Sequence, residues 1–398
     1  MRQQMVRFGL LAVLVAVAAS SRVGAANAGG GQGGAGSAGA GTESPYQSAE
    51  VCGTCHEAIH KAWADSPHAR SATNPLYREA LRLAVEAASD KAKDTVRKEC
   101  VWCHAPTTLL TGDLQLAQPL SQEGVTCDFC HTVAEVDLGR TGHPFALEPG
   151  PVKRGPFEYG AVDGHGTAYS PLHRASPLLC ASCHEYRNSR GVAVMATYSD
   201  WKAGPYPVRG VPCQDCHMAL VPGSIARDSA PRGGLRVINL HRVVGGSAKS
   251  QLARGLDLAI ASFTHGGGNA QVGVTVTNSA AGHPVPGGLP SRALVVSAAV
   301  ETADGRLQHR QEKIYRRELK DDKGRVLTGI ADMFQKAAAV GRDNRIKPQE
   351  SRQERFTLPL PQGARAVVVR LEYRDSSDPR GTPLTTLITE TRRELTGP

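Results

Sequence analysis

The sequence predicts a two-part fold: a mainly α, loop-rich region over residues 45–250, followed by an all-β, immunoglobulin-like sandwich over residues 251–398. Three observations predict it. The pattern Cys-x-x-Cys-His recurs five times, always before residue 250. Apolar residues at helical spacing occur between the first two copies. Beyond residue 250 the apolar residues alternate with polar ones in short runs, which is typical of antiparallel strands.

The first 28 residues have the three-part layout of a secretory signal peptide. Arg2 and Arg7 precede an apolar run over residues 8–19, and small residues follow. The run is too short to span a bilayer comfortably, and a retained anchor is the alternative. We therefore expect an exported chain, periplasmic or extracellular, whose membrane contact is indirect or made through a complex. Residues 29–44 are rich in Gly, Ala and Ser and predict a flexible linker.

The five Cys-x-x-Cys-His copies use all ten cysteines of the chain. This spacing is the attachment site of c-type haem: both thiols bond to the haem, and the adjoining histidine ligates the iron. A redox dithiol or half of a zinc site is the alternative for a single copy. Zinc sites do not require that histidine, however, and dithiol motifs do not recur in fives. The sequence predicts five c-type haems bound by Cys52, Cys55, Cys100, Cys103, Cys127, Cys130, Cys180, Cys183, Cys213 and Cys216, with His56, His104, His131, His184 and His217 on the irons.

Two helices and one long loop are predicted in the first part. Residues 57–66 predict a short helix that Pro67 ends. Residues 75–99 predict the one long helix, because their apolar residues keep a helical period up to Ala88. The segment 139–177 is rich in Gly, Pro and His and predicts a loop. Such a length is unusual inside a compact domain, so we expect this loop to wrap cofactors and carry ligands.

Four segments of the second part predict strands. Val272, Val274 and Val276 alternate with small or polar residues, and residues 293–300 form another apolar run. Residues 356–360 and 366–373 continue the pattern. Several short strands with turn residues between them predict an antiparallel sandwich.

Five irons need second axial ligands, and nine of the fourteen histidines lie outside the motifs. Methionine is a weak competitor, because only Met195, Met218 and Met333 follow the predicted leader. Mostly bis-histidine ligation is therefore expected, and it lowers reduction potentials relative to His/Met ligation. The candidates are His68, His143, His165, His173, His241 and His283.

Alternatives remain open for several of these histidines. A hydrogen bond to a haem propionate is the alternative for His165 and His173, and a loop-stabilising contact is the alternative for His283. His60 lies one helical turn after His56, on the same predicted face, so the two cannot bind one iron from opposite sides. We expect His60 to pack or to contact a propionate.

The formal net charge of +9 is unevenly distributed. Residues 251–398 carry 22 basic and 16 acidic side chains, whereas residues 45–250 carry 21 and 20. Haem propionates make the first part acidic once the haems are attached. Nucleic acid is a poor partner for an exported protein. The basic second part predicts steering toward a redox partner with an acidic surface.

The motifs and their neighbours resemble the multihaem c-type cytochromes related to the tetrahaem cytochrome c of ammonia-oxidising bacteria. The similarity covers roughly residues 48–245. It rests on Trp63, on Ser66-Pro-His68, on Thr126-Cys127-Asp-Phe-Cys130-His131, on Cys180-Ala-Ser-Cys183-His184-Glu185, and on Thr197-Tyr-Ser-Asp-Trp201 before Cys213-Gln-Asp-Cys216-His217-Met218. The resemblance implies electron carriers with closely stacked, mostly bis-histidine haems. It also implies that His68 serves a haem other than its own.

The tail around Gly282-His283-Pro284 is similar to the β-sandwich appended to some of these multihaem proteins. Two features depart from the family pattern: five sites stand where the tetrahaem relative has four, and His60 stands where an aromatic residue is usual. Ligand pairing therefore does not transfer haem by haem.

Together these features predict a periplasmic pentahaem cytochrome c that transfers single electrons between redox partners. One alternative is an oxidoreductase with one open haem that acts on a small nitrogen or sulfur compound. Against it, the histidines suffice for every iron, and no motif has lysine in place of its histidine. Another alternative is a fixed electron-transfer subunit of a respiratory complex, with the basic sandwich as its mounting surface.

Overall fold

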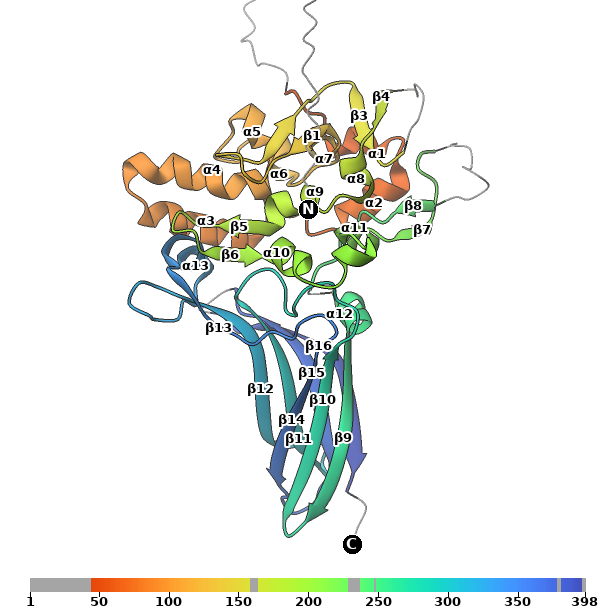
Figure 1. Ribbon diagram of the computed structural model, residues 1–398, viewed down its shortest axis with the longest axis vertical. Coiled ribbons are helices and arrows are strands. Elements are labelled where there is room, and N and C mark those ends of the chain that lie inside the picture. The colour runs from red at the N-terminus through yellow and green to blue at the C-terminus, as the bar shows by residue number, and fades with distance from the viewer. Residues whose placement is uncertain (1–43, 158–163, 228–236, 247, 378–380, 396–398) are drawn as a thin grey trace, which may run out of the picture. The chain divides into compact units, whose positions relative to one another are not determined.

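In the computed structural model, residues 44–157, 164–227, 237–246, 248–377 and 381–395 are described. The predicted signal peptide and all but the last residue of the predicted linker lie outside these ranges. Figure 1 shows helices and short strands up to residue 246, and long strands from residue 256 onward. Within the described ranges, no helix combines the length and the apolar character that crossing a membrane requires.

Each Cys-x-x-Cys-His motif lies in or beside a short helix. The two cysteines of a motif are three residues apart, so a helical turn brings both thiols to one face. The helices concerned are α1 (Ala49–Gly53) and α2 (Glu57–Ala64) around the first motif, α4 (Lys93–His104) at the second, α7 (Cys127–Thr132) at the third, α9 (Leu178–His184) at the fourth and α11 (Cys213–His217) at the fifth.

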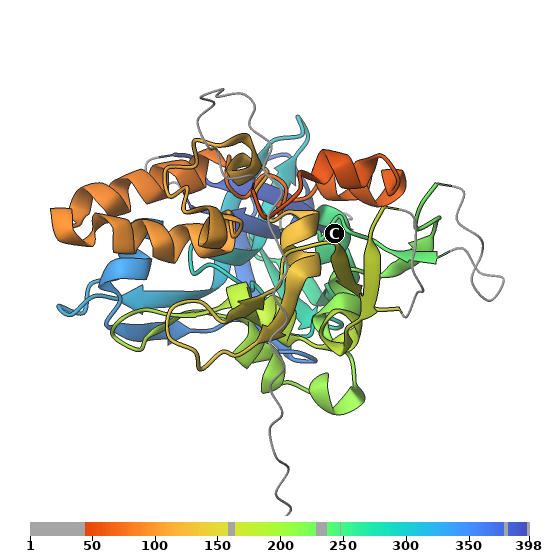
Figure 2. The same cartoon turned by 90° about the horizontal axis from the view of Figure 1, so that it is seen from above.

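The predicted helix over residues 75–99 is divided, which corrects that prediction. It consists of α3 (Pro75–Ala87) and the start of α4, joined by the 3₁₀ turn η1 (Asp90–Ala92). Asn74 caps α3 by accepting hydrogen bonds from the next helical N–H groups, and Pro75 occupies the first position. Ala88 is extended, and the following Ser and Asp favour turns over helix interiors. Figure 2 shows α3 and α4 side by side.

The segment 139–177 holds more regular structure than predicted. It contains β2 (Phe145–Leu147), β3 (Val152–Gly155), β4 (Gly166–Tyr169) and α8 (Pro171–Ala175), while residues 158–163 lie outside the described ranges. β1 (Val133–Val136) pairs with β2 in antiparallel fashion, and β3 pairs with β4 in parallel. The remaining short elements of this part are α5 (Thr108–Thr111), α6 (Pro119–Gln122), β5 (Glu185–Arg187), β6 (Ala193–Ala196), α10 (Thr197–Lys202), η2 (Pro207–Arg209), β7 (Leu220–Pro222) and β8 (Val237–Asn239).

Long antiparallel strands form two sheets after α12 (Lys249–Gly255). One sheet has the order β14-β10-β9, and the other has the order β13-β12-β11-β15-β16. All four predicted strands are present, in β10, β11, β14 and β15. The strands are β9 (Leu256–Gly266), β10 (Asn269–Asn278), β11 (Arg292–Thr302), β12 (Leu307–Lys320), β13 (Ala339–Asp343), β14 (Ser351–Pro359), β15 (Ala364–Asp375) and β16 (Leu384–Glu394).

The core of this β part draws side chains from both sheets. Val272, Val274 and Val276 of β10 are buried, and they join Leu294 of β11 and Phe356 of β14 in one apolar cluster. This is the alternation that the sequence showed: successive side chains of β10 point to opposite faces, and one of these faces is turned toward the core. The second part is therefore rich in β-strands, as predicted, and its immunoglobulin-like identity stays a prediction.

The β part also contributes to the packing of the first part. The helix α13 (Ile330–Lys336), between β12 and β13, packs against α3, and Figures 1 and 2 show the two next to each other. Gln335 Nε2 donates to the carbonyl oxygen of Ala84 at 3.0 Å. A second apolar cluster crosses the junction and is formed by Val192, Val194, Leu319, Leu327, Met333 and Ala337. The predicted boundary near residue 250 falls at α12.

Candidate haem sites

The ten cysteines all lie in described residues, and none of them forms a disulfide there. Thiols of different motifs lie close enough to shift each other's pKa. Cys127 lowers the pKa of Cys52, Cys183 raises the pKa of Cys103, and Cys213 raises the pKa of Cys180. The first motif thus lies near the third, and the fourth lies near the second and the fifth, although the chain separates them widely.

Four motif histidines face a second imidazole at a spacing that suits one iron between them. Metal–imidazole bonds of about 2 Å on both sides of one ion place the two ring centroids roughly 6 Å apart. The four pairs and their centroid distances are His56–His165 at 6.0 Å, His184–His68 at 6.4 Å, His131–His241 at 6.4 Å and His217–His283 at 6.5 Å.

Backbone carbonyls orient most of these rings. A ligating histidine usually donates its other N–H to such a group, which fixes the tautomer and the ring orientation. Seven histidines have this arrangement at Nδ1, which leaves Nε2 for a metal. The accepting oxygens are those of Ile225 for His56, Ser71 for His104, Arg154 for His131, Gly166 for His165, Val244 for His217, Asn239 for His241 and Pro284 for His283.

Burial keeps several of these imidazoles neutral. It lowers the pKa of His68, His104 and His241 to about 4 and that of His184 to about 3, because a charged ring loses its hydration there. The neutral imidazole is the form that binds metals. These side chains are therefore ready to ligate iron over a wide pH range.

His104 differs from the other motif histidines. All fourteen histidines lie in described residues, yet the ring that contacts His104 is Tyr77, with centroids 3.7 Å apart and planes 7° apart. At that distance Tyr77 covers one face of the imidazole, so it is a stacking neighbour of His104. Among the described ring contacts, His104 is the one motif histidine that is not paired with a second imidazole. Sequence reasoning missed Tyr77, which no motif marks.

Two predicted ligands lie elsewhere. His173 is near His131, at 5.5 Å between centroids, but its Nδ1 is 2.9 Å from Ser170 Oγ and its Nε2 is 2.7 Å from the carbonyl oxygen of Cys130. Both ring nitrogens are thus engaged. His143 stacks on Phe145 at 6.0 Å. Their assignment as iron ligands stays a prediction.

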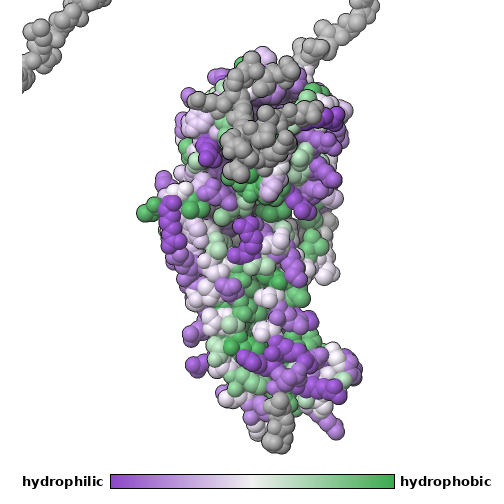
Figure 3. All heavy atoms as spheres, turned by 90° about the vertical axis from the view of Figure 1, so that its right-hand side faces the viewer, coloured by the Kyte–Doolittle hydropathy of each residue, from purple (hydrophilic) through white to green (hydrophobic). Residues whose placement is uncertain are grey.

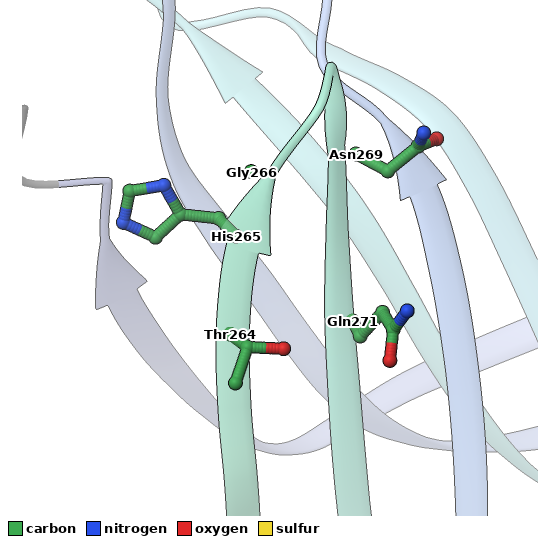
Figure 4. Close-up of a pocket in the computed structure, with 5 residues that line it drawn as sticks. All are labelled: Thr264, His265, Gly266, Asn269 and Gln271. Atoms are coloured by element: carbon green, nitrogen blue, oxygen red, sulfur yellow. The ribbon is translucent and has the colours of Figure 1, made fainter. Parts of the chain in front are cut away.

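Three further histidines complete the set. His60 lies beside Trp63 and 3.8 Å from Glu50, so it is placed as a packing residue. His309 lies in β12, and His265 in β9 near the β9–β10 turn. His265 lines a hollow of about 240 Å³ with Thr264, Gly266, Asn269 and Gln271. Figure 4 shows His265 pointing to the opposite side of β9 from Thr264, so the polar groups do not converge on a common point.

Several buried polar atoms around the motifs have no hydrogen-bond partner among the residues that the structure describes. Buried polar groups are normally satisfied, so each such atom calls for a missing partner. Haem carboxylates and their ordered water would supply acceptors. The donors include Tyr46 Oη, Tyr77 Oη, Trp102 Nε1 and Thr107 Oγ1. The residues present therefore fit a bound haem, with paired cysteines, neutral histidines and free donors in the same region.

Comparisons with known proteins also find c-type cytochromes. Residues 51–132, which hold three of the five motifs, match the family described as cytochrome c554 and c-prime. Over 91 residues the chain is 30% identical to cytochrome c-554 of Nitrosomonas europaea, covering 22% of this chain and 39% of that protein. The chain thus spans about two fifths of the length of this curated relative. The similarity is to c-type cytochromes, which carry covalently bound haem.

A solved structure is similar along most of the chain. The penta-heme cytochrome c552 from Thermochromatium tepidum matches with a TM-score of 0.69 at 21% identity, covering 88% of this chain and 99% of that one. Coverage of that extent includes both the first part and the β part. The fold of this chain is therefore similar to that of this cytochrome, and its second part is rich in β-strands.

Proposed function

We propose that this chain is an exported, periplasmic pentahaem c-type cytochrome that transfers single electrons between redox partners. The observation that carries the proposal is the set of four imidazole pairs, each spaced for one iron and each including one motif histidine. When bound, each haem iron alternates between the ferric and ferrous states and so takes up and releases one electron.

The axial ligands come from distant parts of the chain. In this proposal His165, His241, His68 and His283 are the second ligands at the first, third, fourth and fifth sites. His68 follows the first motif but serves the fourth. Bis-histidine ligation favours low reduction potentials relative to His/Met ligation. Burial lowers the pKa of His68, His241 and His283, and hydrogen bonds to backbone carbonyls fix seven of the site histidines.

The proximity of thiols from different motifs suggests a route for the electrons. Cys52 and Cys127 bring the first and third motifs close enough for each thiol to shift the other's pKa, and Cys103 and Cys213 do the same for the second and fifth motifs with the fourth. The third motif lies near the fourth, because the charge of Cys183 acts on Cys130. We therefore place the sites in the order first, third, fourth, with the second and fifth both next to the fourth.

The docking partner is proposed to have an acidic surface. Many cations of the β part are already paired on the outer face of the five-stranded sheet, for example Arg310 with Glu372 and Arg370 with Glu390. Figure 3 shows hydrophilic and hydrophobic residues mixed over one side of the molecule. Near the fifth site, the charge of Arg254 on α12 acts on Cys216. An acidic partner would be steered toward α12, beside the fifth site.

A second candidate function rests on His104. Its ring stacks on Tyr77 and is paired with no second imidazole among the described ring contacts, so an iron held by His104 would have one axial position without a histidine. An open position of this kind can bind a small nitrogen or sulfur compound, and the chain would then be an oxidoreductase as well as a carrier. Nitrite or nitric oxide added to the oxidised protein tests this: a spectral change at one haem supports it, and no change excludes it.

The carrier function is tested by mass and by electron counting. The exported protein is expected to have the mass of the chain plus five covalent haems, and to take up five electrons per chain from a one-electron reductant. It should then reduce an oxidised, acidic redox protein faster than a basic one, with a rate that falls as salt is added. Fewer haems, or bound zinc in their place, would disprove the proposal. A fixed place in a respiratory complex would show as co-purification with a membrane partner.

A further inference from the structure

His283 comes from the β part, on the loop between β10 and β11. Asn278, which is fully buried, donates from Nδ2 to the carbonyl oxygens of His283 and Ile346, both at 3.0 Å. Val285 and Ile346 exchange two backbone hydrogen bonds of 2.9 and 3.1 Å. The loop is therefore joined to the segment 344–350, and whatever fixes that segment also fixes His283.

Arg345, next to Ile346, fixes that segment to the first part. Its side chain is only 6% exposed. Nη1 donates to Asp200 Oδ2 at 2.8 Å, while Nε and Nη2 donate to Asp343 at 2.9 and 2.8 Å. Asp200 belongs to α10 in the first part, and Asp343 ends β13. A planar guanidinium suits two carboxylates at once, so the arrangement is rigid as well as attractive.

The helix α10 also contacts the His283 loop directly. A Cβ atom at Gly282 would lie 3.3 Å from Trp201 Cδ1, and one at Gly204 would lie 3.4 Å from the carbonyl oxygen of Gly282. Asp200 and Arg345 are close enough to His283 for both charges to act on its imidazole. A hollow of about 360 Å³, lined by Asp200, Pro284, Asp343, Arg345, Lys347 and Arg352, lies beside the ion pairs. The loop has room to move there if the link is cut.

We propose that Arg345 is a positioning residue for the fifth site. Through Asp200 it holds the His283 loop against the first part, so that the imidazole stays opposite His217. This inference rests on the proposed function, because it requires His217 and His283 to ligate one iron.

The test is Asp200→Ala in the full-length protein with its haems attached. This variant cuts the link between the two parts and leaves Arg345 paired with Asp343, so no buried charge is left alone. We expect a high-spin ferric signal that exceeds the parent's by up to one haem per chain, and one further carbon monoxide bound per reduced chain. Added imidazole should abolish both, because it fills the position that His283 has left. A spectrum equal to the parent's would overturn the proposal.

Lys202→Ala is the matched control. Lys202 lies on the same helix, with its ammonium over the ring of Tyr198, 5.9 Å from the centroid. No change in spin state is expected. If the high-spin signal of Lys202→Ala rises as much as that of Asp200→Ala, or by more than one haem per chain, the helix as a whole has loosened. That result would count against a role specific to Asp200 and Arg345.

His283→Ala separates this proposal from the proposed function. If His283→Ala leaves the spectrum unchanged, the axial assignment fails. If His283→Ala changes one haem and Asp200→Ala does not, the assignment stands and the positioning role fails. Arg345→Lys and Asp200→Asn carry the same test should Asp200→Ala yield no mature protein. Lysine cannot span both carboxylates, so Arg345→Lys is expected to give a smaller high-spin increase that imidazole also removes.

Discussion

His68 and His184 face each other with ring centroids 6.4 Å apart, although one follows the first motif and the other closes the fourth. Folding therefore brings a histidine from the start of the chain to a site built much later in it. The same holds for His283, which reaches the fifth site from the β part. Long-range packing, not local sequence, pairs these ligands.

His68→Met is expected to change one haem. A thioether in place of the imidazole raises the reduction potential of that haem, because His/Met ligation favours the ferrous state. Redox titration followed by absorbance should show one of the five transitions moved upward. His143→Met is the control, since His143 stacks on Phe145 and faces no motif histidine among the described ring contacts. No shift for His68→Met would remove His68 from the ligands.

His241→Ala and His173→Ala should differ, although both histidines lie near His131. His241 leaves Nε2 free for iron, whereas both nitrogens of His173 are hydrogen-bonded. We expect His241→Ala to convert one haem from low to high spin and His173→Ala to leave the spin states unchanged. Electron paramagnetic resonance of the two oxidised variants measures this. The reverse result would assign the third site to His173.

Tyr77→Leu is expected to disturb the second site alone. The stacked pair of Tyr77 and His104 is worth about 0.5–1.5 kcal/mol beyond its buried area, so stability should fall by roughly that amount. The spectrum of the second haem should shift as His104 loses its neighbour. Tyr77→Phe keeps the ring and serves as the control. Equal shifts in both variants would mean that the hydroxyl, and not the stacking, matters.

Leu319→Ala should weaken both parts of the molecule together. Leu319 is fully buried in the apolar cluster that crosses the junction, and a buried Leu→Ala change costs about 2–5 kcal/mol. The midpoint temperature of thermal unfolding should fall by the same amount whether unfolding is followed by haem absorbance or by far-ultraviolet circular dichroism. Leu384→Ala, at a leucine that is 69% exposed on β16, is the control with little expected loss. A shift in circular dichroism alone would show that the β part unfolds independently.

The sequence predicted the chemistry of the sites better than their geometry. Spacing alone predicts the cysteines and the motif histidines as haem ligands, because haem attachment requires those residues in that order. It could not distinguish His241 from His173, since the difference lies in which ring nitrogens the folded chain engages. Nor could it mark Tyr77, whose position depends on how α3 packs against α4.

The fold was predicted where one face of an element is apolar. The alternating valines of β10 predict a strand. The strand β12 shows no such pattern, because most of its exposed residues are charged and form ion pairs. The break between α3 and α4 was missed because helical spacing of apolar residues continues up to the turn. The contacts of α13 with α3 depend on tertiary packing, which no local pattern reports.

Quantitative electron paramagnetic resonance of the fully oxidised protein tests the central claim most directly. Four imidazole pairs predict low-spin ferric signals that integrate to four haems per chain, and the absence of a histidine opposite His104 among the described ring contacts predicts a high-spin signal from the haem of the second site. Five low-spin haems would mean that another residue closes the second site. Two or more high-spin haems would contradict the assignment of the four pairs.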